Sequence, residues 1–169
     1  MNMELKEALN KLKNNKEFKQ WKKNNANTFF SYAFKILKEE RFNGWQLGFY
    51  NKSNDKITTF SVNEVKIEIN QEEDVFKKPD MAVKEINTEK LKLPLKKILE
   101  KIEVFKKKNY PKETGEKIIV ILQNLDSFGN IWNITYITKT FNTLNMKVDA
   151  ENGKILQHKL SSIFAFKKE

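Results

Sequence analysis

With 169 residues, 39% of them hydrophobic and 12% aromatic, the chain suits one ordinary domain or two small, closely packed ones, and its 5 glycines and 3 prolines exclude a low-complexity chain. Cysteine is absent, which excludes disulfides, thiolate metal sites and cysteine nucleophiles. The formal net charge is +10, but Arg41 is the only arginine among 32 basic residues, so the charge indicates a lysine-rich solvated surface more than the arginine-based recognition of nucleic acid.

The N-terminal segment, residues 1–26, is predicted to form an amphipathic helix. Phe18 and Trp21 follow three residues apart on this helix or its continuation, and the apolar positions before them recur at helical spacing: Leu5, Ala8, Leu9 and Leu12. The first fifteen residues are polar and lysine-rich, and no segment of the chain has the roughly 18 consecutive apolar residues of a membrane span. As written, the sequence predicts a cytoplasmic protein, or an extracytoplasmic one if a leader has been removed.

A second helix is predicted from about Phe29 to Glu40, with Asn27 or Thr28 as its N-cap. Its broad apolar surface indicates deep burial, and Asn43-Gly44 is a typical end signal.

The apolar period then changes to two. Three stretches alternate and are separated by short polar turns, which predicts an antiparallel meander: residues 45–49, 57–62 and 65–69. An acidic run, Glu72 to Asp74, follows on a loop, then a turn at Pro79-Asp80 and an extended connector over residues 81–93.

The clearest helix begins after Pro94. Its apolar stripe has regular helical spacing and predicts burial: Leu95, Ile98, Leu99, Ile102 and Phe105. Strands are predicted at residues 117–123, 132–138, 141–148 and 154–158, with a tight turn at Glu151-Asn152-Gly153. A last apolar segment covers residues 160–166.

The two halves of the sequence resemble each other. Trp45 corresponds to Trp132 at an offset of 87, and the strands after these tryptophans correspond at offsets of 86 and 88. The strand at 117–123 has no counterpart before Trp45 in this interpretation. We expect two pseudo-symmetric units in which each tryptophan packs a sheet against a helix.

The second half carries a known pattern. A helix, a strand led by Trp132, and the run Val148-Asp149-Ala150-Glu151-Asn152-Gly153-Lys154-Ile155-Leu156 resemble the PepSY domain, with Asn152 where that family usually has threonine. The likeness covers about residues 94–160, with a weaker copy over about 28–70. It implies an α+β fold, a tandem pair of cystatin-like helix-plus-antiparallel-sheet units with an extra N-terminal helix. The expected organisation is an N-terminal helix over 1–26, a first half over 27–80, a connector over 81–93 and a second half over 94–169, or one compact domain.

No catalytic, cofactor-binding or metal-ligating pattern is recognisable. His158 is the lone histidine and is expected to be surface decoration, and the carboxylates of Glu72 to Asp74 lack the spacing of a calcium loop. Glycine-rich phosphate loops and nucleophile elbows are absent from the sequence.

The remaining candidate for partner binding is Trp21, because it lies among three lysines: Lys19, Lys22 and Lys23. The sequence therefore predicts a non-enzymatic protein- or peptide-binding regulatory module without a cofactor. The alternative is a nucleic-acid-associated protein that uses the lysine-rich helices at residues 11–23 and 96–108.

Overall fold

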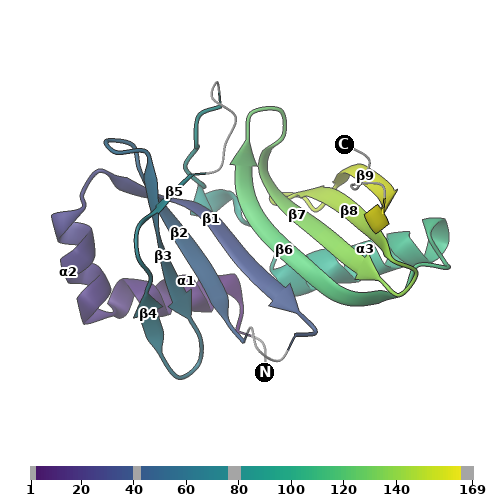
Figure 1. Ribbon diagram of the computed structural model, residues 1–169, viewed down its shortest axis with the longest axis horizontal. Helices are drawn as coiled ribbons and strands as arrows, with labels where there is room; N and C mark the ends of the chain where they lie inside the picture. Colours follow the sequence, from purple (N-terminus) through teal and green to yellow (C-terminus); the bar gives the residue numbers. More distant parts are fainter. Residues whose placement is uncertain (1–2, 40–42, 76–80, 165–169) are drawn as a thin grey trace.

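The computed structural model describes residues 3–39, 43–75 and 81–164. Its strands form one antiparallel sheet in the order β4-β3-β2-β1-β6-β7-β8-β9, with β5 also paired to β3. The helices lie behind this sheet in Figure 1, so the protein is an α+β protein with one helix-covered and one open sheet face. The strands are β1 Thr28–Leu37, β2 Trp45–Asn51, β3 Lys56–Val62, β4 Ile67–Ile69, β5 Glu73–Asp74, β6 Gly115–Leu125, β7 Gly129–Thr138, β8 Asn142–Asp149 and β9 Ile155–Ser162.

The N-terminal helix of the sequence prediction is two helices, α1 (Leu5–Asn14) and α2 (Lys16–Asn24). Asn15 separates them, because its backbone is extended and its Oδ1 accepts a 2.9 Å hydrogen bond from the Phe18 backbone N–H. The predicted apolar stripe is correct and is buried: Leu5, Ala8, Leu9 and Leu12.

The predicted helix from Phe29 to Glu40 is wrong as far as the structure describes it. Residues 28–37 form strand β1, so of the two proposed caps Asn27 precedes a strand and Thr28 is its first residue. Apolar side chains occupy both faces of β1, which hides the period of two that marks a strand. Pairing with β2 on one side and β6 on the other satisfies the hydrogen-bonding groups of the β1 backbone, so tertiary context decides the conformation.

This correction changes the middle of the sheet. Strand β1 precedes Trp45 as β6 precedes Trp132, so a strand does lie before Trp45, where the sequence interpretation placed a helix and no counterpart of 117–123; β1 also pairs with β6. In this antiparallel pair Phe34 lies opposite Ile121. Trp45 pairs with Val62, and Trp132 pairs with Val148. The strands of both predicted halves therefore belong to one continuous sheet.

The two helical regions begin next to each other behind the centre of the sheet. The Leu95 backbone N–H, at the start of α3 (Leu95–Asn109), donates to the Glu4 carboxylate at 3.3 Å. The Trp45 indole N–H donates to the Met3 carbonyl at 2.8 Å, and its ring lies 6.2 Å from the Trp132 ring. The helices run from this point toward opposite ends of the sheet (Figure 1).

The remaining predictions of helices and strands agree with the described residues, with local exceptions. Pro94 precedes α3, and Ile102 is fully buried, but Leu99 is only partly buried. Val65 is 90% exposed and lies in the turn before β4, so it is not a strand residue. Part of the predicted acidic loop forms strand β5, and the connector contains a 3-10 turn at Thr88–Lys90. The turn at 79–80 lies outside the described residues.

Candidate binding surface

The open face of the sheet has an apolar centre. Alternation along β1 and β6 sends one set of side chains to the buried helix side and the other set to the open face. Five apolar side chains on the open face of these two neighbouring strands are partly exposed: Tyr32, Phe34 and Ile36 on β1, and Ile119 and Ile121 on β6. Phe34 faces Ile121 and Ile36 faces Ile119 across the pair, so these side chains form one stripe, hereafter the central stripe.

Polar residues flank the central stripe on both sides. The register places one row of residues straight across the sheet from edge to edge: Glu68, Ser61, Gln46, Phe34, Ile121, Asn133, Lys147 and Gln157. Two apolar residues thus occupy the middle of a polar row, with an acidic side chain near one edge and a basic one near the other.

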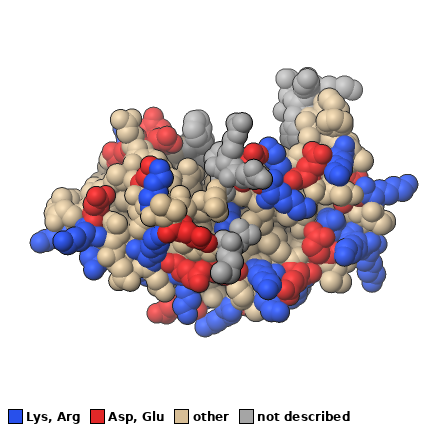
Figure 2. Space-filling view, turned by 90° about the horizontal axis from the view of Figure 1, so that it is seen from below, with Lys and Arg blue, Asp and Glu red and all other residues tan. Residues whose placement is uncertain are grey.

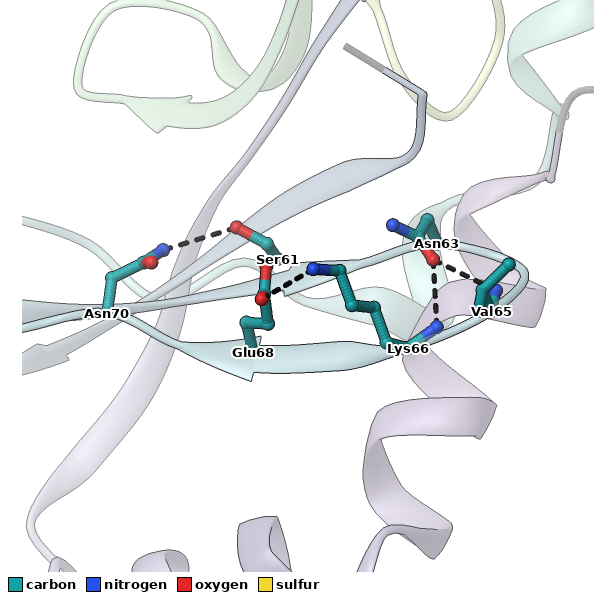
Figure 3. Close-up of polar contacts among 6 residues, drawn as sticks. All are labelled: Ser61, Asn63, Val65, Lys66, Glu68 and Asn70. Atoms are coloured by element: carbon teal, nitrogen blue, oxygen red, sulfur yellow. Dashed lines mark hydrogen bonds and ion pairs between the residues drawn. The ribbon is translucent and has the colours of Figure 1, made fainter. Parts of the chain in front are cut away.

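The flank on the β3–β4 side is held by local hydrogen bonds, shown in Figure 3. The Asn63 Oδ1 accepts the backbone N–H groups of Val65 and Lys66 at 2.9 and 2.8 Å, which fixes the turn. Lys66 pairs with Glu68 at 2.7 Å, and the Asn70 amide donates to the Ser61 hydroxyl at 3.2 Å.

The flank on the β7–β8 side is also fixed. The Asn145 amide donates to Asn133 Oδ1 at 2.6 Å and to the Thr135 hydroxyl at 2.9 Å. The Lys147 ammonium donates to Gln157 Oε1 at 2.9 Å. Because these amides hold one another, they form ordered polar borders rather than freely rotating side chains.

Two hollows adjoin the central stripe. One, of about 330 Å³, lies near Gly44 and the β3–β4 turn, and the other, of about 600 Å³, lies near the connector at residues 81–84. Phe34 lines both hollows. The apolar surface therefore continues along β1 from one hollow to the other.

Tyr32 covers a glycine at the end of the stripe near residues 81–84. It pairs with Gly48, where an added Cβ atom would clash with the Tyr32 ring, so only glycine lets the ring rest on the backbone of β2. Burial, and then the nearby Glu73 carboxylate, raise the pKa of the Tyr32 hydroxyl to about 12. Like that of any tyrosine, the hydroxyl is protonated at neutral pH, so it can donate a hydrogen bond to a partner.

Trp21, the aromatic residue singled out in the sequence, packs inward from α2. Its ring centroid lies 4.9 Å from Phe60, 5.8 Å from Phe49 and 5.8 Å from Phe18. These contacts belong to the core on the helix side of the sheet. The structure therefore accounts for Trp21 by packing.

The three lysines beside Trp21 do not act as one group. The Lys22 ammonium hydrogen bonds to the backbone carbonyl of Thr28 and, at 3.1 Å, to its hydroxyl. Lys19 and Lys23 are exposed. On the face of the molecule shown in Figure 2, lysines and acidic residues are interspersed rather than separated into patches of one sign.

The other polar candidates have structural partners. His158 lies on β9, where its Nδ1 meets the Tyr110 hydroxyl and its ring lies 4.9 Å from the Phe105 ring. The Asn54 amide donates to Glu72 at 2.7 Å. Among the described residues no group of three or more His, Asp or Glu side chains could hold a metal ion, and no helix is long and apolar enough to span a membrane.

The central stripe was missed in the sequence because β1 was interpreted as a helix. A signal was present: Tyr32, Phe34 and Ile36 alternate in Phe29–Leu37 with Ser31, Ala33 and Lys35. Lys35 lies on the helix side with 4% exposure, and its ammonium lies 5.1 Å from the centre of the Trp45 ring. A lysine on the buried face and phenylalanine on the open face invert the usual pattern.

Comparison with known proteins adds information about the fold. No family model matches the chain, and no curated protein matches its sequence. The crystal structure of a "putative lipoprotein" from Clostridium difficile 630 has a similar fold, with a TM-score of 0.55 and 10% sequence identity over 86% of this chain and 90% of that one.

Proposed function

We propose that this protein is a non-enzymatic module that binds a protein or peptide partner through the open face of its sheet. The observation that carries the proposal is the central stripe, an apolar surface that no described helix covers. An apolar centre with a hydrogen-bonded polar border is the usual anatomy of a protein interface.

The shape of the surface favours a polypeptide partner. The stripe runs along β1 and ends in a hollow at each end, so an extended segment could place a side chain in each hollow while it crosses Phe34. The ordered amides of Asn133 and Asn145 on one side can hydrogen bond to a partner's backbone without first losing rotamer freedom.

Nucleic acid fits this surface less well. The open-face row described above carries one lysine, Lys147, and the positions next to Phe34 in that row are neutral. Nucleic-acid affinity depends on many lysine and arginine contacts to phosphates. The net charge is +10, but the lysines are spread over the chain, and on the face shown in Figure 2 they are interspersed with acidic residues.

We also propose that the two halves are copies of one helix-plus-antiparallel-sheet unit, as the PepSY resemblance implies. Two features support this proposal. Phe34 lies opposite Ile121, which is its counterpart at the offset of 87. The pair Trp45–Val62 corresponds to Trp132–Val148. The stripe would then lie on the pseudo-symmetry axis, where both copies contribute residues.

Affinity capture from native cells tests the function. The bait is the whole chain, compared with Phe34→Ser on the stripe and with Val104→Ser as the matched control, since Val104 is 72% exposed on α3. Nuclease is added in parallel. We expect a protein that wild type and the Val104 variant retain, that the Phe34 variant loses, and that nuclease does not release. Equal capture by the two variants, or release by nuclease, contradicts the proposal.

The cellular location is proposed separately. We keep the cytoplasm as the proposed location, with the cell surface as the alternative that the fold shared with the lipoprotein supports. Fractionation of native cells with an antibody to the chain distinguishes the two.

A further inference from the structure

The two edges of the sheet differ in length. At one edge β4 has 3 residues and β5 has 2, and both pair with β3, so this edge is short and divided. At the other edge β9 has 8 residues, and no strand in the described part of the chain pairs with its outer side. Natural proteins protect exposed edges with short strands, bulges, prolines or charges. Strand β9 has one bulge, near its start opposite Lys147 and Val148, and one charged side chain, Lys159, so most of its length is unprotected.

The backbone groups on the outer side of β9 follow from its pairing with β8. The Ile163 N–H donates to the Phe141 carbonyl at 2.9 Å, just beyond the last pair of the two strands. Antiparallel strands exchange hydrogen bonds at every second residue pair, so three residues of β9 direct their backbone groups toward β8: Gln157, Lys159 and Ser161. The residues that alternate with these direct their N–H and C=O groups away from the sheet: His158, Leu160 and Ser162. All three are exposed, and they centre on Leu160.

Large apolar side chains are exposed at the same edge. Leu160 is 39% exposed within the strand, and Phe164, just beyond it, is 59% exposed. The Phe164 ring lies 5.9 Å from the ring of Phe141, which is 60% exposed in the turn before β8. Unpaired backbone groups together with exposed apolar side chains favour a partner that adds a strand to the sheet.

We propose that this partner is a second copy of the chain, whose β9 pairs antiparallel with the first β9 around a two-fold axis at Leu160. In this register Leu160 lies opposite its own copy, and His158 exchanges backbone hydrogen bonds with Ser162 in both directions. Lys159 lies opposite Ser161, so no like charges face each other. The strand thus complements itself, which is the requirement of a two-fold interface between identical chains.

The neighbouring registers are less favourable. An axis at Lys159 would place two ammonium groups directly opposite each other, which destabilises a strand pair. An axis at His158 would place Ser162 opposite residue 154, which lies outside the strand, and would leave the outward groups of Ser162 without a strand partner. Charge and length therefore both favour the axis at Leu160.

The dimer would have one continuous sheet. Directly opposite residues of antiparallel strands point to the same face, so the two-fold axis is perpendicular to the sheet and both open faces look in the same direction. Pairing at β9 leaves the central stripe uncovered. The inference is therefore independent of partner binding at the stripe, and each can fail without the other.

Sedimentation equilibrium of the whole wild-type chain over a range of concentrations tests the proposal first. We expect a mass that rises with concentration from 20.0 kDa toward twice that value. In amide hydrogen exchange followed by NMR, the N–H groups of His158, Leu160 and Ser162 should exchange more slowly as the concentration rises, because they become paired. A mass of 20.0 kDa up to about 1 mM protein would overturn the proposal, since any dimer tighter than millimolar is populated there. So would a dimer in which these three amides exchange at an unchanged rate.

Matched variants test the position of the axis. Leu160→Lys and Leu160→Glu each place like charges opposite each other, so each should weaken self-association at least about tenfold. An equal mixture of the two should restore the dimer, because a lysine then lies opposite a glutamate. Val104→Lys, which makes the same charge change at a 72% exposed position of α3, should dimerise like the wild type. Equal effects at positions 104 and 160, or a mixture that stays monomeric, would overturn the proposal. If the Leu160 variants do not fold, the exchange rates of the wild type decide.

Discussion

Truncation of Ile102 to alanine measures how strongly the sheet depends on α3. Ile102 is fully buried at the centre of α3, between the equally buried Ile98 and the aliphatic stem of Lys106. The change removes three buried carbons, about 2.4 kcal/mol of transfer free energy at about 0.8 kcal/mol for each, and a cavity term adds to it. We therefore expect the free energy of unfolding to fall by about 2–5 kcal/mol.

The measurement is denaturant unfolding followed by circular dichroism, with Val104→Ala as the control. Val104 lies two residues away on the same helix and is 72% exposed, so its truncation should change the free energy of unfolding by less than about 0.5 kcal/mol. The two midpoints should differ clearly while the slope with denaturant stays constant. A loss below about 1 kcal/mol for Ile102→Ala would show that α3 does not pack on the sheet as described.

Three further predictions concern the sheet, the acid stability and the charge. Gly48→Ala should lower the free energy of unfolding by about 1–3 kcal/mol in the same assay, because the new Cβ would displace the Tyr32 ring, and an unchanged midpoint would contradict this packing. The hydrogen bond from the Thr140 hydroxyl, at 2.7 Å, holds the pKa of the buried Glu113 carboxyl below its ordinary value of 4.5. The contribution of the ionised Glu113 to stability is therefore present above pH 4.5 and is lost as pH falls through the folded pKa. Glu113→Gln should accordingly cost stability at pH 7 and progressively less in acid, and a constant difference across that range would refute the assignment. Fluorescence anisotropy should show weak nucleic-acid binding without preference for sequence or strand state. If about six phosphates are contacted, the affinity should fall by roughly 10³-fold between 50 and 200 mM salt. Selective binding at about 150 mM salt would instead favour the nucleic-acid alternative.

The sequence was informative where apolar side chains kept one period. The stripe of α1 and the alternation after Trp45 predicted their elements, because large apolar side chains recur on one face of each. The antiparallel order of the later strands followed from short turns such as that at Gly153, where a positive φ of 74° favours glycine.

The prediction failed at the centre of the sheet, where no single period exists. Strand β1 has paired neighbours on both sides and apolar residues on both faces, so its pattern resembles that of a buried helix. The candidate site lies on this strand and was therefore missed with it. Trp21 was singled out instead because the neighbouring lysines are visible in sequence, whereas its contacts with Phe49 and Phe60 form only in the folded protein.

Site-specific photocrosslinking in native cells tests the central claim most directly. p-Benzoylphenylalanine is placed at Phe34 or Ile121 on the central stripe, and at Val104 on the solvent side of α3 as the control. Partner binding through the open face predicts one discrete crosslinked protein from both stripe positions and none from position 104. Crosslinks from position 104 alone, or crosslinks from the stripe to nucleic acid, would contradict it.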